Sequence, residues 1–429
     1  MSNYFSLAVL LALMIIVYIF DRKNFKKEAS LFYLRRTERG LAFIERFSSR
    51  HKKFFERFSD LGIIFSFGTL GAWYLFKTRK SKGVIIKTAL SFVLLYLVFG
   101  IMLKPLSSEA LVPSSFFGAS GFIVAYLLKA AYDMIFVAAA LPAVQLVLPI
   151  NIPNAPVFFV PIDFWLISIF VILVAHEFSH ALVAKAQGIN VKSLGYGFLA
   201  ILPLGFAEPD QEQIKKSKSL VKTRIYGAGS FANFIVALLS IPLILGVMFA
   251  YSGSVDAVGV SYNGTIENMP ADGLLPENGI VTMIGGNETK DMYNLSVVMD
   301  TYRPGDTITV LVDSVEYTFV LASNPDNETK AFMGISDIKQ ETVNTIPGSF
   351  GNIIVSVLMY MFTLLNFVFM LNLGIGLANL LPIKPLDGGL MFEEIAKTAG
   401  IRNWKNVVKF VSMFTLVLLL FNIFGGFLF

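Results

Sequence analysis

The chain has 429 residues, of which 55% are hydrophobic and 15% are charged, and its mean hydropathy is +0.67. Soluble domains carry about 25% charged residues, so this composition excludes an ordinary soluble protein and favours one that crosses a membrane several times. The chain has no cysteine, which excludes disulfides, thiolate metal ligands and a cysteine nucleophile.

The net charge of +5 is unevenly spread along the chain. Residues 21–59 hold 12 Lys and Arg against 5 Asp and Glu, whereas residues 251–345 hold 4 against 14. Because basic loops remain in the cytoplasm, we expect the first segment inside and the second outside. A basic face near anionic lipid explains the first segment, so we predict no nucleic-acid partner.

The first 160 residues carry several apolar stretches. Residues 5–20 have no basic residues before them and no cleavage site after them, which predicts a retained span instead of a signal peptide. Residues 21–59 predict an amphipathic helical segment at the cytoplasmic surface. Residues 61–76 predict either a short span or a re-entrant segment. Residues 84–103 predict a clear span. Residues 117–149 predict either one span or a broken one. Membrane-surface packing and substrate gating are alternative roles for this region.

The next predicted span, residues 163–186, contains the motif His176-Glu-Phe-Ser-His180. Positions i and i+4 share one face of a helix, so the two imidazoles point the same way. In this H-E-x-x-H pattern two histidines hold zinc and the glutamate, here Glu177, activates water. The alternative is a structural pair of histidines, although burying these groups without a metal is costly.

A catalytic zinc site needs three protein ligands and a position for water. Without cysteine or a suitable third histidine, the third ligand is expected to be a carboxylate. Asp387 is the best candidate because it lies in Pro385-Leu-Asp-Gly-Gly389 at the end of a span; a simple turn residue is the alternative. The rival carboxylates are Asp133, Asp163, Glu208 and Asp210.

The remaining segments alternate between apolar and polar character. Residues 194–207 predict a short hairpin that dips towards the site, with an interfacial loop as the alternative. Residues 225–250, 350–378 and 407–428 predict three further spans, which brings the total to about eight membrane segments. Residues 251–345 predict a soluble, strand-rich domain. Four N-x-S/T sequons in it fit an exported face: Asn263, Asn287, Asn294 and Asn327.

The start of the span 225–250 carries the pattern Gly229-Ser-Phe-Ala-Asn233. Small residues let helices approach closely, so the glycine is consistent with packing alone. Asn233 is interpreted either as a structural residue or as a hydrogen-bond donor to the substrate carbonyl or the oxyanion.

Three motifs together resemble those of the site-2 protease family of intramembrane zinc metalloproteases. They are H-E-x-x-H at 176–180, G-x-x-x-N at 229–233, and N-x-x-P-x-x-x-L-D-G from Asn379 to Gly388. The resemblance covers roughly residues 163–425.

This resemblance implies a role for each matching residue. The zinc ion (Zn2+) is held by His176, His180 and Asp387, and Glu177 activates water. Asn233 and Asn379 help to bind or position the substrate. The segment 194–207 matches the family's membrane-associated hairpin, which is proposed to pair with an unwound substrate strand.

The acidic segment resembles a PDZ domain at three places: Met269–Gly279, Ile280–Gly286 and Pro304–Val310. Asn278-Gly279 stands where such domains have Gly-Asp. A PDZ-like domain binds peptide ends or edges by strand addition. The competing role is a filter that excludes bulky ectodomains.

We therefore predict a polytopic α-helical membrane protein with a membrane-associated β-hairpin and an extramembrane PDZ-like α+β domain. Residues 1–160 form N-terminal membrane segments, residues 161–250 and 346–429 the two halves of a protease core, and residues 251–345 the extracytoplasmic PDZ-like domain.

The predicted function is an intramembrane zinc endopeptidase that cleaves the transmembrane segments of other membrane proteins, with its active site towards the cytoplasm. Three alternatives remain. The first is a proteolytically inactive scaffold that acts through its PDZ-like domain. The second is a transporter with a structural histidine pair, which would be expected to show inverted repeats. The third is a prenyl-protein type of membrane protease with a glutamate as third ligand.

Overall fold

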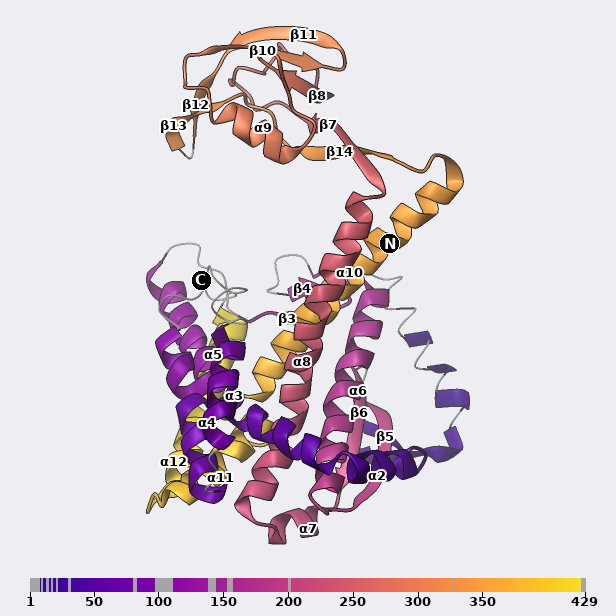
Figure 1. Ribbon diagram of the computed structural model, residues 1–429, viewed down its shortest axis with the longest axis vertical. Coiled ribbons are helices and arrows are strands. Elements are labelled where there is room, and N and C mark those ends of the chain that lie inside the picture. The colour runs from indigo at the N-terminus through magenta and orange to yellow at the C-terminus, as the bar shows by residue number, and fades with distance from the viewer. Residues whose placement is uncertain are drawn as a thin grey trace. The chain divides into compact units, whose positions relative to one another are not determined.

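The computed structural model describes residues 22–29, 32–79, 83–96, 111–137, 144–152, 157–199, 202–325 and 327–425, and residues 8, 11, 12, 15, 16 and 18–20. The chain folds as two compact units (Figure 1). One comprises Met1–Leu243 and Thr363–Phe429, and the other Ile244–Phe362.

Five helices in the described part of the chain are long and apolar enough to cross a bilayer, which requires about 20 residues. They are part of α5 (Phe116–Phe136 of Leu111–Phe136), α6 (Ile162–Ala186), α8 (Ser219–Ser252), α10 (Gly348–Asn379) and α12 (Trp404–Phe424). The helices predicted at 163–186, 225–250, 350–378 and 407–428 are thereby confirmed. The protein is a multi-pass membrane protein.

The predicted total of eight membrane segments is not reached among the described residues. Half of the predicted span 5–20 lies outside them. Of the span predicted at 84–103, the structure describes a 13-residue helix, α4 (Gly83–Leu95), and residues 97–103 lie outside the described residues. Residues 61–76 lie inside α3 (Lys52–Arg79), and whether they span or re-enter the membrane stays a prediction.

The helical prediction for residues 21–59 is wrong in its first half. After a short 3-10 turn, η1 (Arg22–Asn24), the chain forms strands β1 (Phe25–Ala29) and β2 (Phe32–Thr37). Helix begins only at α2 (Leu41–Arg50). Strand β2 pairs with β5 from Phe32 opposite Leu199 to Thr37 opposite Leu194. A partner so distant in sequence leaves no trace in local hydrophobic periodicity.

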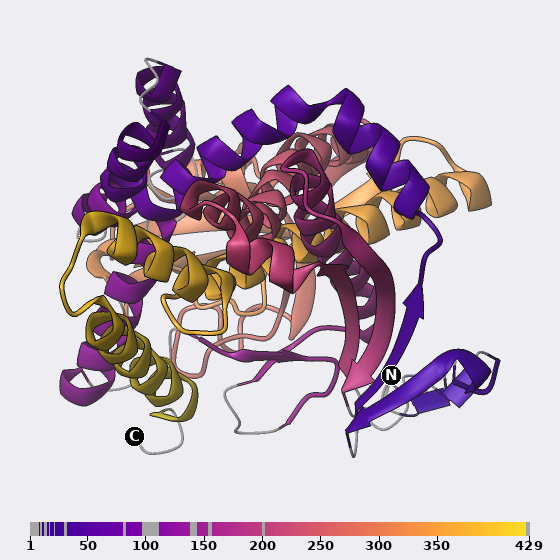
Figure 2. The same cartoon turned by 90° about the horizontal axis from the view of Figure 1, so that it is seen from below.

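The hairpin predicted at 194–207 is confirmed as β5 (Val191–Leu199) and β6 (Leu202–Pro209), which pair in antiparallel register. The strand order of this sheet is β1-β2-β5-β6, so the N-terminal strands extend the hairpin on the β5 side and β6 is an edge strand. Figure 2 shows β5 and β6 running beside the indigo N-terminal strands.

Two of the N-terminal helices are broken where they meet. Helix α3 is non-helical at Gly68 and helix α5 at Gly118, whose φ angles are 56° and 63°. A Cβ atom on Gly118 would overlap the backbone between Phe65 and Gly68, so glycine is required for this close approach. Helices α3 and α5 then share one hydrophobic core with α8, α10, α11 and α12 through residues such as Phe65, Phe122, Phe231, Leu377, Ile395 and Leu418.

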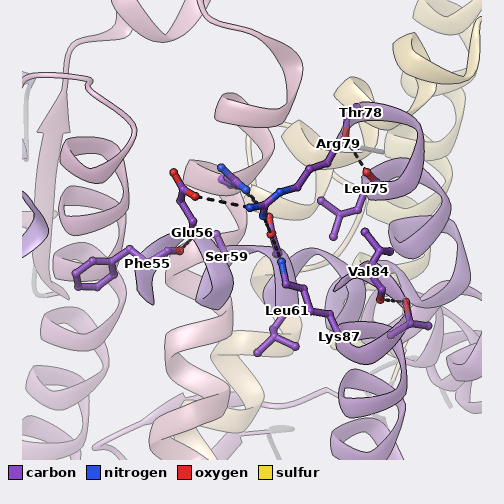
Figure 3. Close-up of polar contacts among 12 residues, drawn as sticks. Phe55, Glu56, Ser59, Leu61, Leu75, Thr78, Arg79, Val84 and Lys87 are labelled. Carbon is purple, nitrogen blue, oxygen red and sulfur yellow. Dashed lines mark hydrogen bonds and ion pairs between the residues drawn. The ribbon is translucent and has the colours of Figure 1, made fainter. Parts of the chain in front are cut away.

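The buried carboxylate of Asp60 joins three helices of this unit. Its side chain is fully buried and accepts hydrogen bonds from Arg79 at the end of α3, from Lys87 in α4 and from Arg224 in α8. Arg79 also approaches Glu56 at 3.8 Å (Figure 3). One buried carboxylate is therefore shared by three cationic side chains.

The second unit contains the predicted strand-rich region, and its sheet has the order β11-β10-β8-β7-β14, with β9 paired to β8. Its core includes Val260, Val281, Leu295 and Val310. The strands are β7 (Val255–Asn263), β8 (Asn278–Ile284), β9 (Asn287–Glu288), β10 (Thr307–Val312), β11 (Val315–Val320), β12 (Ala322–Asn324), β13 (Asn327–Phe332) and β14 (Lys339–Asn344), and the helix is α9 (Met292–Met299).

The remaining short elements belong to the first unit. They are the parallel pair β3 (Leu146–Leu148) and β4 (Val157–Phe159), and the helices α7 (Gln211–Lys216) and α11 (Asp387–Ala399).

The Asp60 cluster yields a stability prediction. Replacing Asp60 by Asn leaves the buried guanidinium of Arg224 without its counter-charge, so the free energy of unfolding should fall by about 3–5 kcal/mol. Thermal and denaturant unfolding of the detergent-solubilised protein measure this. The matched control is Glu45→Gln, which breaks an exposed pair with Lys185 and should cost under about 1 kcal/mol. Equal effects of the two substitutions would contradict the proposed importance of the cluster.

Candidate active site

Helix α6 presents His176, Glu177 and His180 on consecutive turns inside an apolar sequence. The two imidazole rings have centroids 4.7 Å apart and their Nε2 atoms are 3.1 Å apart. Both side chains are largely buried, with 12% and 14% of their surface exposed. The spacing of four residues has therefore brought the two nitrogens to one point.

Asp387 reaches the same point from the first residue of α11. Its Oδ2 lies 3.5 Å from Nε2 of His176 and 3.4 Å from Nε2 of His180. Among the described residues, these three side chains form the one cluster of His, Asp and Glu with the spacing of a metal site. Two elements far apart in sequence thus contribute to one set of donor atoms.

The three donor atoms fit a zinc ion. Ligands at 2.0–2.2 Å in tetrahedral arrangement lie about 3.3–3.5 Å from one another, and the observed separations are 3.1, 3.4 and 3.5 Å. Two imidazoles and one carboxylate are also a donor set that catalytic zinc uses, with the fourth position left for water.

The outer atoms of the ligands are themselves held in place. Nδ1 of His180 lies 2.7 Å from the backbone oxygen of Ile225 in α8. This bond puts the proton on Nδ1 and leaves Nε2 free to bind a metal. Ser230, also in α8, donates a hydrogen bond of 3.0 Å to Oδ2 of Asp387.

Asn233 is fully buried beside His176. Its Nδ2 lies 3.2 Å from Nδ1 of that histidine, and its Oδ1 has no hydrogen-bond partner among the described residues. The structure therefore places Asn233 behind a candidate ligand.

Gly229 provides the space in which the imidazoles lie. A Cβ atom at this position would overlap His176 and His180. Gly227, two residues earlier in the same helix, would meet only the flexible end of Met391. The glycine of the G-x-x-x-N pattern is thus a spatial requirement of the site.

Glu177 points towards the hairpin. Its Oε2 accepts a 2.9 Å hydrogen bond from the backbone N–H of Ala207 in β6. Figure 1 shows α6 and the hairpin side by side. Because this N–H points away from β5, the N–H and C=O of Gly205, two residues earlier, point the same way.

Two cavities meet at Glu177. An apolar cavity of about 510 Å³ lies between α6 and the hairpin. A polar cavity of about 490 Å³, lined by residues of α7, α8 and α11 among others, reaches both Glu177 and His180. The apolar cavity is lined by, among others, Leu166, Phe170, Leu173, Val174, Tyr196 and Phe206. A hydrophobic chain and water can therefore approach the same carboxylate from different sides.

Charged side chains surround the polar cavity. Lys384 lies 2.5 Å and Lys397 2.6 Å from Glu393, and Lys397 also bonds Glu394 at 2.9 Å. Burial alone would raise the pKa of Glu393. The hydrogen bonds from the two lysines outweigh this effect and lower that pKa below its usual value. Glu393 therefore stays ionised at neutral pH.

Three of the four rival carboxylates have other partners. Asp133 pairs with Lys129, Glu208 with Arg36 and Ser193, and Asp210 caps α7 through the N–H groups of Glu212 and Gln213. Asp163 lies in the first turn of α6. None of the four joins the cluster of metal-site spacing.

Asn379 is the last residue of α10 and is half-buried. Among the described residues no hydrogen bond joins it to His176, His180 or Asp387, so a role in positioning substrate stays a prediction.

Sequence reasoning missed Ser230 and the carbonyl of Ile225. Ser230 could have been found, because it lies three residues before Asn233 on the same helical face; a backbone carbonyl gives no sequence signal.

Comparison with known proteins agrees with this geometry. Residues 164–422 match the model of peptidase family M50. The chain is 27% identical over 260 residues to an uncharacterized protein of Methanocaldococcus jannaschii, a match that covers 58% of this chain and 63% of that protein, less than two thirds of its length.

Two further relatives have informative names. One, from Clostridium perfringens and provisionally named as a zinc metalloprotease, is 24% identical over 298 residues, or 54% of this chain and 87% of that protein. The other, from Arabidopsis thaliana, is named as a homolog of the membrane-bound transcription factor site-2 protease and is 24% identical over 157 residues, or 34% of this chain and 30% of that protein.

The family model covers more than half of the chain, and it includes all three residues of the candidate metal site. The chain therefore belongs to peptidase family M50.

Proposed function

We propose that the protein is an intramembrane zinc endopeptidase that cleaves transmembrane segments of other membrane proteins. The observation that carries this proposal is the position of Glu177, which lies beside the candidate metal ligands and lines both an apolar and a polar cavity. Hydrolysis of a membrane segment needs a hydrophobic substrate and water to meet at one base.

The residues that would hold zinc are His176, His180 and Asp387, as their donor-atom separations support. Zinc bound there would act as a Lewis acid on the scissile carbonyl and on the attacking water. The imidazoles supply neutral nitrogen donors and the carboxylate offsets part of the positive charge.

Glu177 is the proposed general base. It takes a proton from the attacking water and passes it to the leaving amine. The N–H of Ala207 holds one carboxylate oxygen, which leaves the other free to face water. A peptide bond then breaks, and the substrate gains a new carboxylate and a new amine.

The edge of β6 is the proposed binding site for an unwound substrate strand. The β5 side of the hairpin is already paired with β2, so β6 offers the open edge of the hairpin. The N–H and C=O of Gly205 face outwards there. A substrate strand paired at this edge would lie next to Glu177.

The charge distribution supports an active site towards the cytoplasm. Lys215 and Lys222 line the polar cavity, and basic segments remain inside. The acidic second unit would then be extracytoplasmic. Within it, a cavity of about 620 Å³ between α9 and residues 329–335 supports peptide binding by a PDZ-like domain.

Zinc content and cleavage separate this proposal from an inactive scaffold. Wild-type protein purified in detergent should contain about one zinc per chain, and Asp387→Ala should lose it. Glu177→Gln should keep the zinc but cleave a model transmembrane substrate roughly 10²–10⁴-fold more slowly, because only the proton transfer is removed. A well-folded wild type without zinc would favour the scaffold. Asp387→Ala that keeps its zinc would point to another third ligand.

The two glycines of α8 provide a second test with a matched control. Gly229→Ala inserts a methyl group between the imidazoles, so we expect loss of zinc. Gly227→Ala meets only the movable end of Met391 and should keep it. Zinc analysis and thermal unfolding of both variants check this. Normal zinc binding by Gly229→Ala would contradict the proposed geometry.

We propose that Asn233 acts on His176 instead of contacting substrate. For Nε2 to bind zinc, Nδ1 must carry the proton and needs an acceptor. Rotating the Asn233 amide by 180° places its otherwise unpartnered Oδ1 against this N–H. The interaction would orient the ring and fix its tautomer.

Substitution of Asn233 distinguishes the two roles. Asn233→Asp retains an acceptor and should keep zinc affinity, whereas Asn233→Leu should weaken it about 10–100-fold, as measured by chelator competition. If Asn233 is instead a donor to the oxyanion, Asn233→Leu keeps its zinc affinity and both variants lose kcat.

A further inference from the structure

A basic recess lies between α11 and the first turns of α12, beside the proposed active site. Its volume is about 580 Å³. Among the residues that line it are three lysines, one glutamate and one tryptophan: Lys384, Lys405, Lys409, Glu393 and Trp404. Val408 and Met413 supply apolar surface to the same recess.

The cations of the recess exceed its anions. Glu393 already has two partners, Lys384 and Lys397. Lys405 and Lys409 are exposed, and neither has a carboxylate within ion-pair distance in the part of the chain that the structure describes. They are four residues apart on one helix, where like charges repel. A bound anion would remove this repulsion.

The surface of α12 changes from charged to apolar in the direction of the span. Lys405, Lys409, Met413 and Val417 follow one another at steps of four residues and so lie along one face. Met413 and Val417 are 53% and 61% exposed. Trp404 begins the helix, and tryptophan prefers the membrane–water interface. Two cations above an apolar stripe match the order of phosphate and acyl chains in a phospholipid.

We propose that this recess binds the phosphate of an anionic phospholipid whose acyl chains lie along the apolar face of α12. Lys405 and Lys409 contact the phosphate, and Trp404 lies at the level of the headgroups. Lys384 and Glu393 line both this recess and the polar cavity of the active site, so the lipid would be bound beside the mouth of that cavity.

The test uses the full chain. Purified protein is incubated with equal amounts of phosphatidylglycerol and phosphatidylcholine, and native mass spectrometry counts the lipids retained. Wild type should retain the anionic lipid preferentially. At about fivefold per lysine, Lys405→Ala/Lys409→Ala should reduce this preference about twenty-five-fold. Lys405→Arg/Lys409→Arg keeps the charge and should preserve it.

The control is Lys216→Ala/Lys218→Ala, which removes the same charge from exposed positions outside the recess. It should leave the preference within about twofold of wild type, and thermal unfolding verifies that all variants are folded. An equal loss in this control would show general surface attraction and overturn the proposal. So would equal retention of both lipids by wild type, or complete displacement of the lipid by excess inorganic phosphate.

Discussion

The convergence of three donor atoms inside an apolar environment is the constraint on which the rest of the first unit depends. Two imidazoles and a carboxylate lie within 3.1–3.5 Å of one another, and bare burial of such groups is costly. The three ligand side chains therefore need hydrogen-bond partners and space around them. Helix α8 supplies them: a carbonyl from Ile225 and a hydroxyl from Ser230, with room for both rings at Gly229.

The position of α8 is in turn tied to the N-terminal helices. Arg224, one residue before Ile225, forms a buried ion pair with Asp60 of α3. Arg79 and Lys87 bond the same carboxylate. The N-terminal residues lie outside the match to the peptidase family, yet they contact the helix that orients one of the candidate ligands. In this chain they are an integral part of the first unit, although their sequence shows no catalytic motif.

Local patterns in the sequence predicted the parts of the site that depend on local geometry. The spacing of His176 and His180 defines a common helical face, and the glycines after Asp387 indicate a turn at the end of a span. The prediction of the hairpin and of four apolar helices also relied on local composition. By contrast, the strand pairing of β2 with β5 joins residues about 160 positions apart. The partners of Asp60 are dispersed over three helices. Such contacts depend on how the elements pack, which periodicity does not encode.

The sheet shows how such long-range pairing bears on function. A hairpin that stood alone would offer two edges to a substrate strand, and the register of that strand would be poorly specified. Here β2 occupies the β5 side, and the N–H of Ala207 on the remaining edge is bonded to Glu177. The open positions on this edge thus begin at Gly205, which lines the apolar cavity, and end at the proposed base Glu177, which also lines the polar cavity. The N-terminal strands, which carry no chemistry themselves, leave one edge of the hairpin from which a bound strand can reach that base.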